Sequence, residues 1–159
     1  MSGGFLQHNI FGVPDIDNFR DAAAAIIVME DGRYLMQQLD DIPGIFYPDH
    51  WGLFGGALEP GESGEAALRR ELREELGFTP DSVRYFTNME FDFACLSGGR
   101  CIRVFYEVEL VVDKLSQLRL TEGRSMQALD ITEILLNRRV VPYDSFAIWM
   151  HHARQNSAN

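Results

Sequence analysis

Three glutamates, Glu71, Glu74 and Glu75, are spaced so that a helix would carry all of them on one face. At 3.6 residues per turn they fall within a sector about 100° wide. Like charges at these spacings destabilise a helix unless opposite charge offsets them. Arg70 can offset one carboxylate, and a hard divalent cation would neutralise the rest. Because all these ligands are oxygens, the pattern favours Mg²⁺ or Mn²⁺ over Zn²⁺.

The alternative interpretation of this charge run is a solvated acidic helix face. The preceding residues favour a site instead, because a glycine-rich approach through Gly56 enters the helix and Glu62 stands at the junction. Glycine lets the backbone approach a ligand closely, and a helix N-terminus offers free N–H groups to phosphate oxygens. An apolar stripe beside the carboxylates predicts that the helix packs on a sheet; it consists of Leu68, Leu72 and Leu76.

From Gly56 to Phe78 the chain resembles the Nudix box, G-x5-E-x7-R-E-U-x-E-E-x-G-U, in which U is an aliphatic or bulky apolar residue. Nine constrained positions over 23 residues make chance agreement very improbable. Every one of them is satisfied, by Gly56, Glu62, Arg70, Glu71, Leu72, Glu74, Glu75, Gly77 and Phe78.

The resemblance implies an α/β (α+β) fold, namely a Nudix-type α/β/α sandwich with a mixed β-sheet and the box as a loop–helix–loop. It also implies metal-dependent hydrolysis of a nucleoside diphosphate linked to another moiety, with Mg²⁺ or Mn²⁺ as cofactor. By this resemblance the metal ligands are Glu71, Glu74 and Glu75, with the carbonyl of Gly55 or Gly56 as a further donor.

The same resemblance gives roles to three other charged residues. Arg70 is expected to hold the carboxylates by ion pairing, and Glu62 to brace the loop or reach the metal through water. Glu122 occupies a region where many Nudix enzymes place a further glutamate, as metal ligand or base. The alternative for Glu122 is an exposed turn carboxylate. The identity of the general base stays open, because that residue differs among Nudix subfamilies.

Three aromatic residues just before the box, Tyr47, Trp51 and Phe54, are candidates to stack on a base or sugar. The alternative is that they are core residues, as aromatic side chains more often are. His50 is a candidate substrate contact. Many family members have a proline before the two glycines of this approach, where this chain has Phe54. That difference argues against the branch that clears oxidised nucleoside triphosphates, and no subfamily is assigned.

The elements expected around the box are mostly strands, each delimited by turn residues. Asp31-Gly32 predicts a hairpin turn, and Ser63 and Gly77 predict the start and end of the box helix. The expected strands are Ala22–Met29, Arg33–Gln38, Trp51–Leu58, and a long hairpin of residues 82–94 and 102–112 with its turn at Ser97-Gly98-Gly99. Edge strands are expected at Leu118–Leu120 and Ser125–Leu129. A helical turn is expected at Ile131–Leu136 and a closing helix at Tyr143–Arg154.

The closing helix is expected from the spacing of Phe146, Ile148, Trp149 and His152. The domain division is a partly mobile lead-in over residues 1–20 and a single Nudix hydrolase domain over residues 21–155. Cys95 and Cys101 lie where they could bridge a hairpin tip, and the alternative is two reduced thiols.

The net charge of −10 over 159 residues argues against nucleic acid and membrane surfaces as partners. No signal peptide or membrane-spanning run is recognised, so the expected location is cytoplasmic. The expected partner is a small-molecule nucleoside diphosphate derivative. A homodimer is an open alternative to a monomer, because the resemblance is to a family in which dimers are frequent. The leading function is a pyrophosphohydrolase, and the alternative is a Nudix-fold nucleotide-sensing or regulatory module without turnover. Retention of every box carboxylate favours the enzyme.

Overall fold

The computed structural model describes residues 20–94 and 99–157, and its sheet is organised around β1 (Ala22–Met29). This strand has the predicted bounds and is largely buried, as its unbroken apolar run indicated. One edge of β1 pairs in parallel with β6 (Arg100–Leu110). The other edge is shared between two antiparallel strands, β4 (Phe54–Ala57) near its start and β2 (Tyr34–Gln38) near its end. The sheet therefore forks between β4 and β2.

The remaining strands extend this seven-stranded mixed sheet. On one side β5 (Arg84–Asp92) pairs antiparallel with β6, which confirms the predicted long hairpin. On the other, β3 (Trp51–Gly52) and β7 (Ser125–Leu129) both pair antiparallel with β2. The helices are α1 (Gly64–Leu76), the short α2 (Val112–Leu115), the π-helical turn η3 (Glu133–Asn137) and α3 (Pro142–Ser157).

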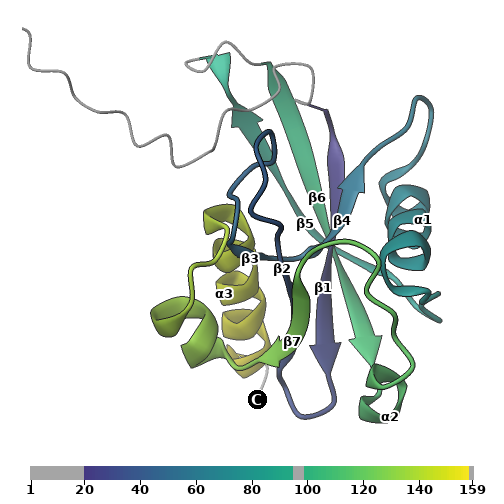
Figure 1. Cartoon of the computed structure of the whole chain (residues 1–159), viewed down its shortest axis with the longest axis vertical. Coiled ribbons are helices and arrows are strands. Elements are labelled where there is room, and N and C mark those ends of the chain that lie inside the picture. Colours follow the sequence, from purple (N-terminus) through teal and green to yellow (C-terminus); the bar gives the residue numbers. More distant parts are fainter. Residues whose placement is uncertain (1–19, 95–98, 158–159) are drawn as a thin grey trace, which may run out of the picture.

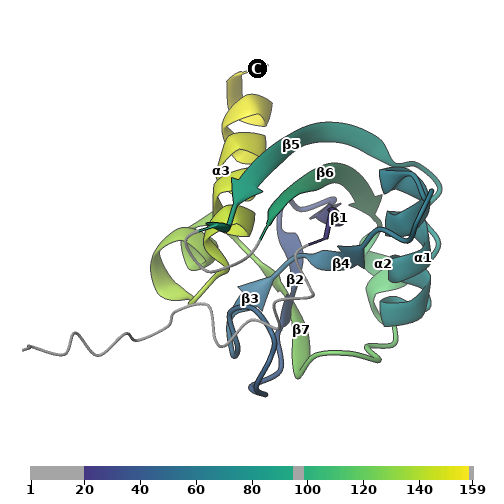
Figure 2. The same ribbon diagram turned by 90° about the horizontal axis from the view of Figure 1, so that it is seen from above.

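Helices α1 and α3 cover opposite faces of the sheet, as Figures 1 and 2 show. The alternating side chains of β1 serve two cores. Ala23, Ala25 and Ile27 pack with the leucines of α1, whereas Ala24 and Ile26 pack with Ile148 of α3 and with Phe105. This is the predicted sandwich of helices around a mixed sheet, so the expected fold class is confirmed.

The strand expected at Leu118–Leu120 is not formed. Instead, the backbone of this segment serves the end of α1: the Arg119 N–H donates to the Leu76 carbonyl at 3.0 Å, and the Thr121 N–H donates to the Glu75 carbonyl at 2.9 Å. The last carbonyls of a helix lack partners within the helix, and this segment satisfies two of them. An alternating pattern of leucines was therefore misread as a sheet edge.

The closing helix α3 is confirmed, but the residues that predicted it lie partly on its outer side. Phe146 and Trp149 are half exposed and stack on each other with ring centroids 5.8 Å apart. The buried positions form the regular series Asp144, Ala147, Ile148 and His151. Asp144 and His151 are polar, and their burial requires hydrogen-bond partners inside the protein. The hydrophobic pattern of the sequence alone does not predict that these two residues are buried.

Some predictions lie outside the described residues: the lead-in up to residue 19, Cys95 and the first part of the Ser97-Gly98-Gly99 turn. The hairpin strand expected up to residue 112 ends at Leu110, and Val112 opens α2 instead. Within the described ranges, none of the helices has the length and apolar character needed to cross a membrane.

Candidate active site

Helix α1 begins and ends at the residues that its sequence specifies. The Ser63 hydroxyl accepts a hydrogen bond from the Ala66 N–H at 3.2 Å, and Gly77 closes the helix in a left-handed conformation with φ of 64°. Both features satisfy backbone groups that the helix leaves unpaired. Leu68, Leu72 and Leu76 are fully buried against the sheet, so the acidic residues between them are held at the edge of that contact.

Arg70 connects the acidic residues of the box through all of its nitrogen donors. Its guanidinium forms a fork with Glu62 at 3.1 and 2.9 Å, and it donates to Glu71 at 2.6 Å and to Glu74 at 3.4 Å. It also donates to the carbonyl of Ala57 at 3.0 Å, which ties α1 to the end of β4. The Arg70 guanidinium lowers the pKa of Glu62, whose carboxylate is thereby committed to bracing the loop.

Glu71 lies against the backbone of Gly56. A Cβ placed on residue 56 would collide with the Glu71 carboxylate, so a side chain at this position would displace it. Gly55 is constrained differently, because its φ of 131° is open mainly to glycine and an added Cβ would strike the Ala23 carbonyl. The two glycines of β4 thus let the strand lie close to both the helix and β1.

Glu75 is the buried carboxylate of the box, with only 5% of its surface exposed. It accepts hydrogen bonds from the Gly55 N–H at 3.0 Å and from the Gln37 side-chain amide at 3.4 Å. Burial raises the pKa of Glu75 to about 7, and the negative charges of Glu71 and Glu122 add to the increase. Two carboxylates of α1 and one from a later loop therefore act on one another here.

Glu122 is carried to the site by the segment that follows α2. The Thr121 hydroxyl donates to the Glu74 carbonyl at 2.7 Å, and its backbone N–H donates to the Glu75 carbonyl. Glu122 itself is exposed at the wall of a cavity that Glu75 also lines. The segment expected to be a strand is thus a support that places Glu122 beside the buried carboxylate.

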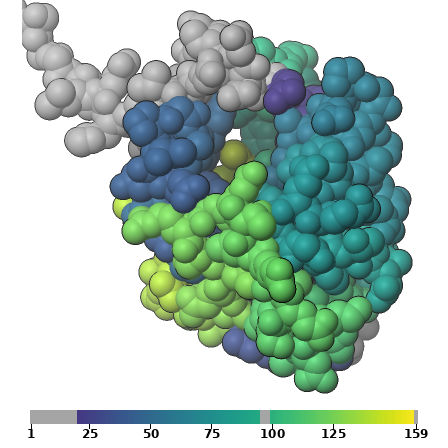
Figure 3. Space-filling model, turned by 45° about the vertical axis from the view of Figure 1, so that its right-hand side comes forward, coloured from purple at the N-terminus to yellow at the C-terminus, as the bar shows by residue number. Residues whose placement is uncertain are grey.

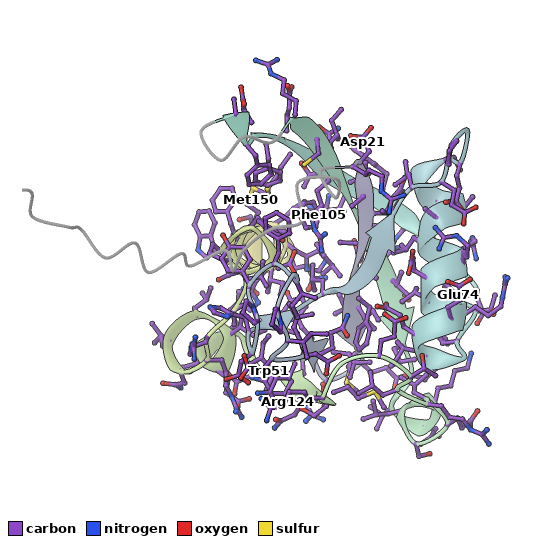
Figure 4. The ribbon with its side chains drawn as sticks, turned by 45° about the horizontal axis from the view of Figure 1, so that its top comes forward. Asp21, Trp51, Glu74, Phe105, Arg124 and Met150 are labelled. Atoms are coloured by element: carbon purple, nitrogen blue, oxygen red, sulfur yellow. The ribbon has the colours of Figure 1, made fainter. Side chains whose placement is uncertain are left out.

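The four glutamates differ in how far they are already engaged. The Glu74 side chain is 60% exposed, and its carboxylate is paired with Arg70 at 3.4 Å. Figure 4 shows Glu74 on α1, well apart from Phe105. In residues 20–94 and 99–157, no three acidic, histidine or cysteine side chains are gathered closely enough to hold a metal ion. The donors are nevertheless the all-oxygen kind that Mg²⁺ and Mn²⁺ select, and they repel one another without a cation.

A cavity of about 320 Å³ extends from Glu75 and Glu122 across the fork between β2 and β4. Figure 3 shows a hollow between the blue segment around residues 40–50, the green loop and the teal surface. On its other wall the cavity reaches Phe46, Arg103, Tyr143 and Asp144. Two glutamates therefore line one end of this cavity, and an arginine and an aspartate line the other.

A second cavity of about 300 Å³ adjoins the first, since Ile45, Phe46, Arg103 and Tyr143 line both. Its walls also include Gly56 and Ala57 at the start of the box and the rings of Phe91 and Phe93 on the other side. It is mainly apolar and aromatic, with Arg103 and the exposed Arg20 as its cations. Cavities of this size and lining are typical binding sites for small molecules.

The three aromatic candidates before the box are all buried. Phe54 lies in the α1 core and Trp51 in the α3 core, where Arg138 covers its ring at 5.4 Å. Tyr47 packs edge-on against Tyr143. These positions match the core alternative. His50 lines neither of these two cavities, and its Nδ1 lies 2.8 Å from the Pro48 carbonyl.

The sequence interpretation missed Arg103, Tyr143 and Asp144. The sequence offered one signal for Arg103, which is its position on a strand rich in apolar residues. A charged residue in such a strand needs a partner of opposite charge if it is buried. That partner, Asp144, was assigned no role before the fold brought it to within 3.3 Å of Arg103.

Residues 18–150 match the model of the NUDIX domain family. Since this span covers most of the chain, the chain belongs to that family. The chain is also 53% identical over 106 residues to nucleoside triphosphatase NudI of Escherichia coli O17:K52:H18 (strain UMN026 / ExPEC), covering 52% of this chain and 73% of that protein. Matches to NudI from other strains of that species cover 36% of those proteins. The expectation of a Nudix hydrolase is confirmed.

Two solved structures illustrate the fold. The MutT protein from Methanosarcina mazei Go1 superposes with a TM-score of 0.71 at 20% identity, covering 87% of this chain and 96% of that one. The NUDIX domain of Shewanella oneidensis NrtR, complexed with ADP ribose, gives a TM-score of 0.68 at 16% identity, covering 86% and 88%. At such identities the likeness establishes the fold alone.

Proposed function

We propose that the chain hydrolyses the diphosphate linkage of a nucleoside diphosphate derivative with Mg²⁺ or Mn²⁺ as cofactor. The observation that carries this proposal is the buried Glu75 carboxylate, which Glu71 and Glu122 influence electrostatically at the wall of a cavity. A buried carboxylate with like charges beside it is costly unless a cation neutralises it. The all-oxygen donor set fits a hard divalent cation.

Glu71 and Glu75 are the residues best placed to hold that cation, with Glu74, Glu122 and a carbonyl of Gly55 or Gly56 as further donors. Glu62 is left to brace the loop, because both of its oxygens accept from Arg70. A bound Mg²⁺ would neutralise phosphate oxygens and lower the pKa of a water molecule for attack at phosphorus.

The protein's own contribution is to fix the carboxylates before substrate arrives. Arg70 holds Glu71 at 2.6 Å, and the Gly55 N–H holds Glu75 at 3.0 Å. Arg70 also ties α1 to β4, because it donates to the Ala57 carbonyl at 3.0 Å. Preorganised groups of this kind need little rearrangement during the reaction.

A nucleoside triphosphate is the first substrate class to test, because the relative NudI is named as a nucleoside triphosphatase. Nucleotide sugars and dinucleotides contain the same diphosphate linkage and remain within the proposal. The alternative is a sensing module that binds such a ligand without turnover; the similar NUDIX domain of NrtR is known in complex with ADP ribose. Complete retention of the box carboxylates favours turnover.

The test is a panel of nucleoside triphosphates, nucleotide sugars and dinucleotides incubated with the protein and Mg²⁺. We expect release of phosphate, pyrophosphate or a nucleoside monophosphate from at least one class, and no release in EDTA. Binding without turnover of any panel member would contradict the hydrolase and support the sensing module. The matched control is Glu65→Gln on the exposed first turn of α1, which should hydrolyse at the normal rate.

A further inference from the structure

Arg103 occupies the wall shared by the two cavities, and its surroundings do not use up its hydrogen-bonding capacity. Its side chain is 17% exposed, and its Nε lies 3.3 Å from an Asp144 oxygen in an ion pair that does not meet hydrogen-bond geometry. To the described residues the guanidinium donates no hydrogen bond at all. An arginine has five donors and no acceptor, so a partner for these groups must supply acceptor atoms.

Asp144 neutralises Arg103 and fixes its position. The carboxylate is 2% exposed, and its other oxygen accepts from the Leu53 N–H at 2.9 Å. The ring of Tyr143 lies 5.0 Å from the guanidinium carbon and that of Phe105 lies 5.7 Å away. The arginine is thus held between aromatic faces with its charge balanced, an arrangement better matched to a neutral acceptor group than to a second anion.

The neighbouring apolar cavity has the character of a site for a flat aromatic ligand. Phe91 and Phe93 stack with centroids 6.0 Å apart, and Phe91 also contacts Tyr143 at 5.2 Å. Any nucleobase can stack on such aromatic side chains, whichever base it is. Recognition of one base over another must then come from polar groups in the wall. Of its two cations, Arg103 is held between aromatic faces, whereas Arg20 is exposed.

The sheet register sets the distance from this arginine to the box. Ala22 of β1 pairs with both Arg103 of β6 and Ala57 of β4, so the two flanking residues are two strand spacings apart. Two spacings amount to about 9–10 Å. A phosphate held at the box and a base edge at Arg103 would be separated by one sugar and the base itself, which is compatible with this span.

We propose that Arg103 is a specificity-determining residue that donates from its Nη groups to a carbonyl-bearing nucleobase edge, such as that of guanine or uracil, and so selects against adenine. This inference rests on the proposed function. Arginine recognises guanine through its O6 and N7 acceptors, whereas adenine presents an amino donor at the position of O6. With adenine, an Nη donor of Arg103 would face the amino donor of the base. The Nη groups would then lose their hydrogen bonds to water without gaining an acceptor.

The experiment compares kcat/KM for GTP, UTP and ATP, which share the sugar and phosphates. We expect the wild-type protein to favour GTP or UTP over ATP by about tenfold to a hundredfold, the range that a two-hydrogen-bond base contact supports. Because Arg103→Met alone would leave Asp144 buried without its partner, the informative variant is the double change Arg103→Met with Asp144→Asn. An asparagine can still accept from the Leu53 N–H.

In the double variant the preference should fall to within about threefold, through a higher KM for the carbonyl-bearing substrates. Arg20→Met is the matched control, since it removes an arginine from the same cavity and should keep the base preference. The inference is wrong if the wild-type protein treats the three bases alike, or if the double variant keeps the preference. It is also wrong if the double variant weakens all three substrates equally, because Arg103 would then contact the common sugar-phosphate part.

A second measurement separates this inference from the proposed hydrolysis. Calorimetry with GMP and AMP reports base recognition without any turnover. If no triphosphate is hydrolysed but GMP binds at least tenfold more tightly than AMP, and the double variant abolishes that difference, the base contact stands and the proposed function fails. Hydrolysis together with equal GMP and AMP affinities would leave the function in place and remove the role of Arg103.

Discussion

The Glu71 carboxylate occupies the space directly beside the Gly56 backbone that a Cβ on residue 56 would fill. The same carboxylate accepts a hydrogen bond from Arg70 at 2.6 Å. Two constraints, one steric from β4 and one ionic from Arg70, therefore fix the first carboxylate of the acidic α1 face. A glycine is needed at position 56 because the Glu71 carboxylate lies so close to the backbone. It is not needed for an unusual backbone angle, since the φ of Gly56 is not positive.

This relationship makes Gly56→Ala a test of Glu71 placement. We expect kcat/KM to fall by about tenfold or more, because a displacement of about 1 Å in a catalytic group is that costly. The fold should persist, as an alanine at this φ is unstrained. Gly99→Ala is the control, because Gly99 also lacks a positive φ and an added Cβ meets open space. Normal kinetics for Gly56→Ala with saturating Mg²⁺ would show that Glu71 is not needed in this position.

Glu75→Gln should separate activity from stability. The amide keeps the size of the side chain and can accept from the Gly55 N–H, but it loses the charge that would bind metal. We expect turnover to fall by about a hundredfold or more. Without metal, at neutral pH, the free energy of unfolding should rise on the order of 1 kcal/mol, because a buried, repelled charge is gone.

The measurement pairs steady-state kinetics with urea unfolding in EDTA. Glu65→Gln, an exposed carboxylate on the same helix, is expected to change neither quantity by more than the error. If Glu75→Gln turned out markedly less stable than wild type, the carboxylate would be a structural group that already has sufficient partners. Near-normal turnover would remove Glu75 from the ligand set.

Much of the fold could be predicted because local signals and tertiary packing agree. The Ser63 cap, the leucine stripe and Gly77 specify α1 to the residue, and an unbroken apolar run identified β1. The errors came where tertiary partners override local pattern. Leu118–Leu120 looked like a strand, yet its backbone pairs with the end of α1, a partner that no local pattern reveals.

The candidate site likewise contains residues that local sequence signals predict and residues that only the tertiary fold brings together. The box residues are contiguous and periodic, so their common face follows from helix geometry alone. The Arg103–Asp144 pair joins residues far apart in the chain, and it forms only because β6 and α3 meet on one face of the sheet. Glu122 is intermediate: the resemblance pointed to it, whereas its support by Thr121 depends on the tertiary fold.

Thr121→Val tests that support. The valine has the shape of threonine but loses the hydroxyl that donates to the Glu74 carbonyl at 2.7 Å. We expect the free energy of unfolding to fall by about 0.5–1.5 kcal/mol, the usual value of one hydrogen bond, and kcat to fall severalfold as Glu122 loses its position. Thr87→Val is the control, since its hydroxyl makes only a long contact of 3.5 Å. A stability loss with unchanged kcat would show that Glu122 takes no part in catalysis.

His151 gives the protein a predictable pH dependence. The ring is fully buried, with its Nδ1 3.0 Å from the Tyr34 hydroxyl, and burial lowers the pKa of His151 from its ordinary 6.5. The unfolded chain therefore binds the proton more readily than the folded one. Its contribution to stability is present above pH 6.5 and is lost as the pH falls below it, with a slope of up to about 1.4 kcal/mol per pH unit.

Urea unfolding of wild type and His151→Gln at pH 5.5 and 7.5 measures this contribution. The variant should be less stable at pH 7.5, because its packing against Tyr34 is altered, but it should lose less stability between the two pH values. Equal losses in both proteins would mean that another group dominates the acid response.

Metal and nucleotide should bind as a linked pair. With a net charge of −10 and an acidic α1 face, the metal-free site should repel a diphosphate. Mg²⁺ reverses the local sign, so the affinity for a nonhydrolysable nucleoside diphosphate analogue should rise at least tenfold when Mg²⁺ replaces EDTA. By reciprocity the analogue must tighten Mg²⁺ binding by the same factor, which calorimetry in both orders of addition can verify. Equal nucleotide affinity in both buffers would show that the phosphates do not bind at the acidic face. Glu71, Glu74 and Glu75 would then be a solvated helix face rather than a metal site.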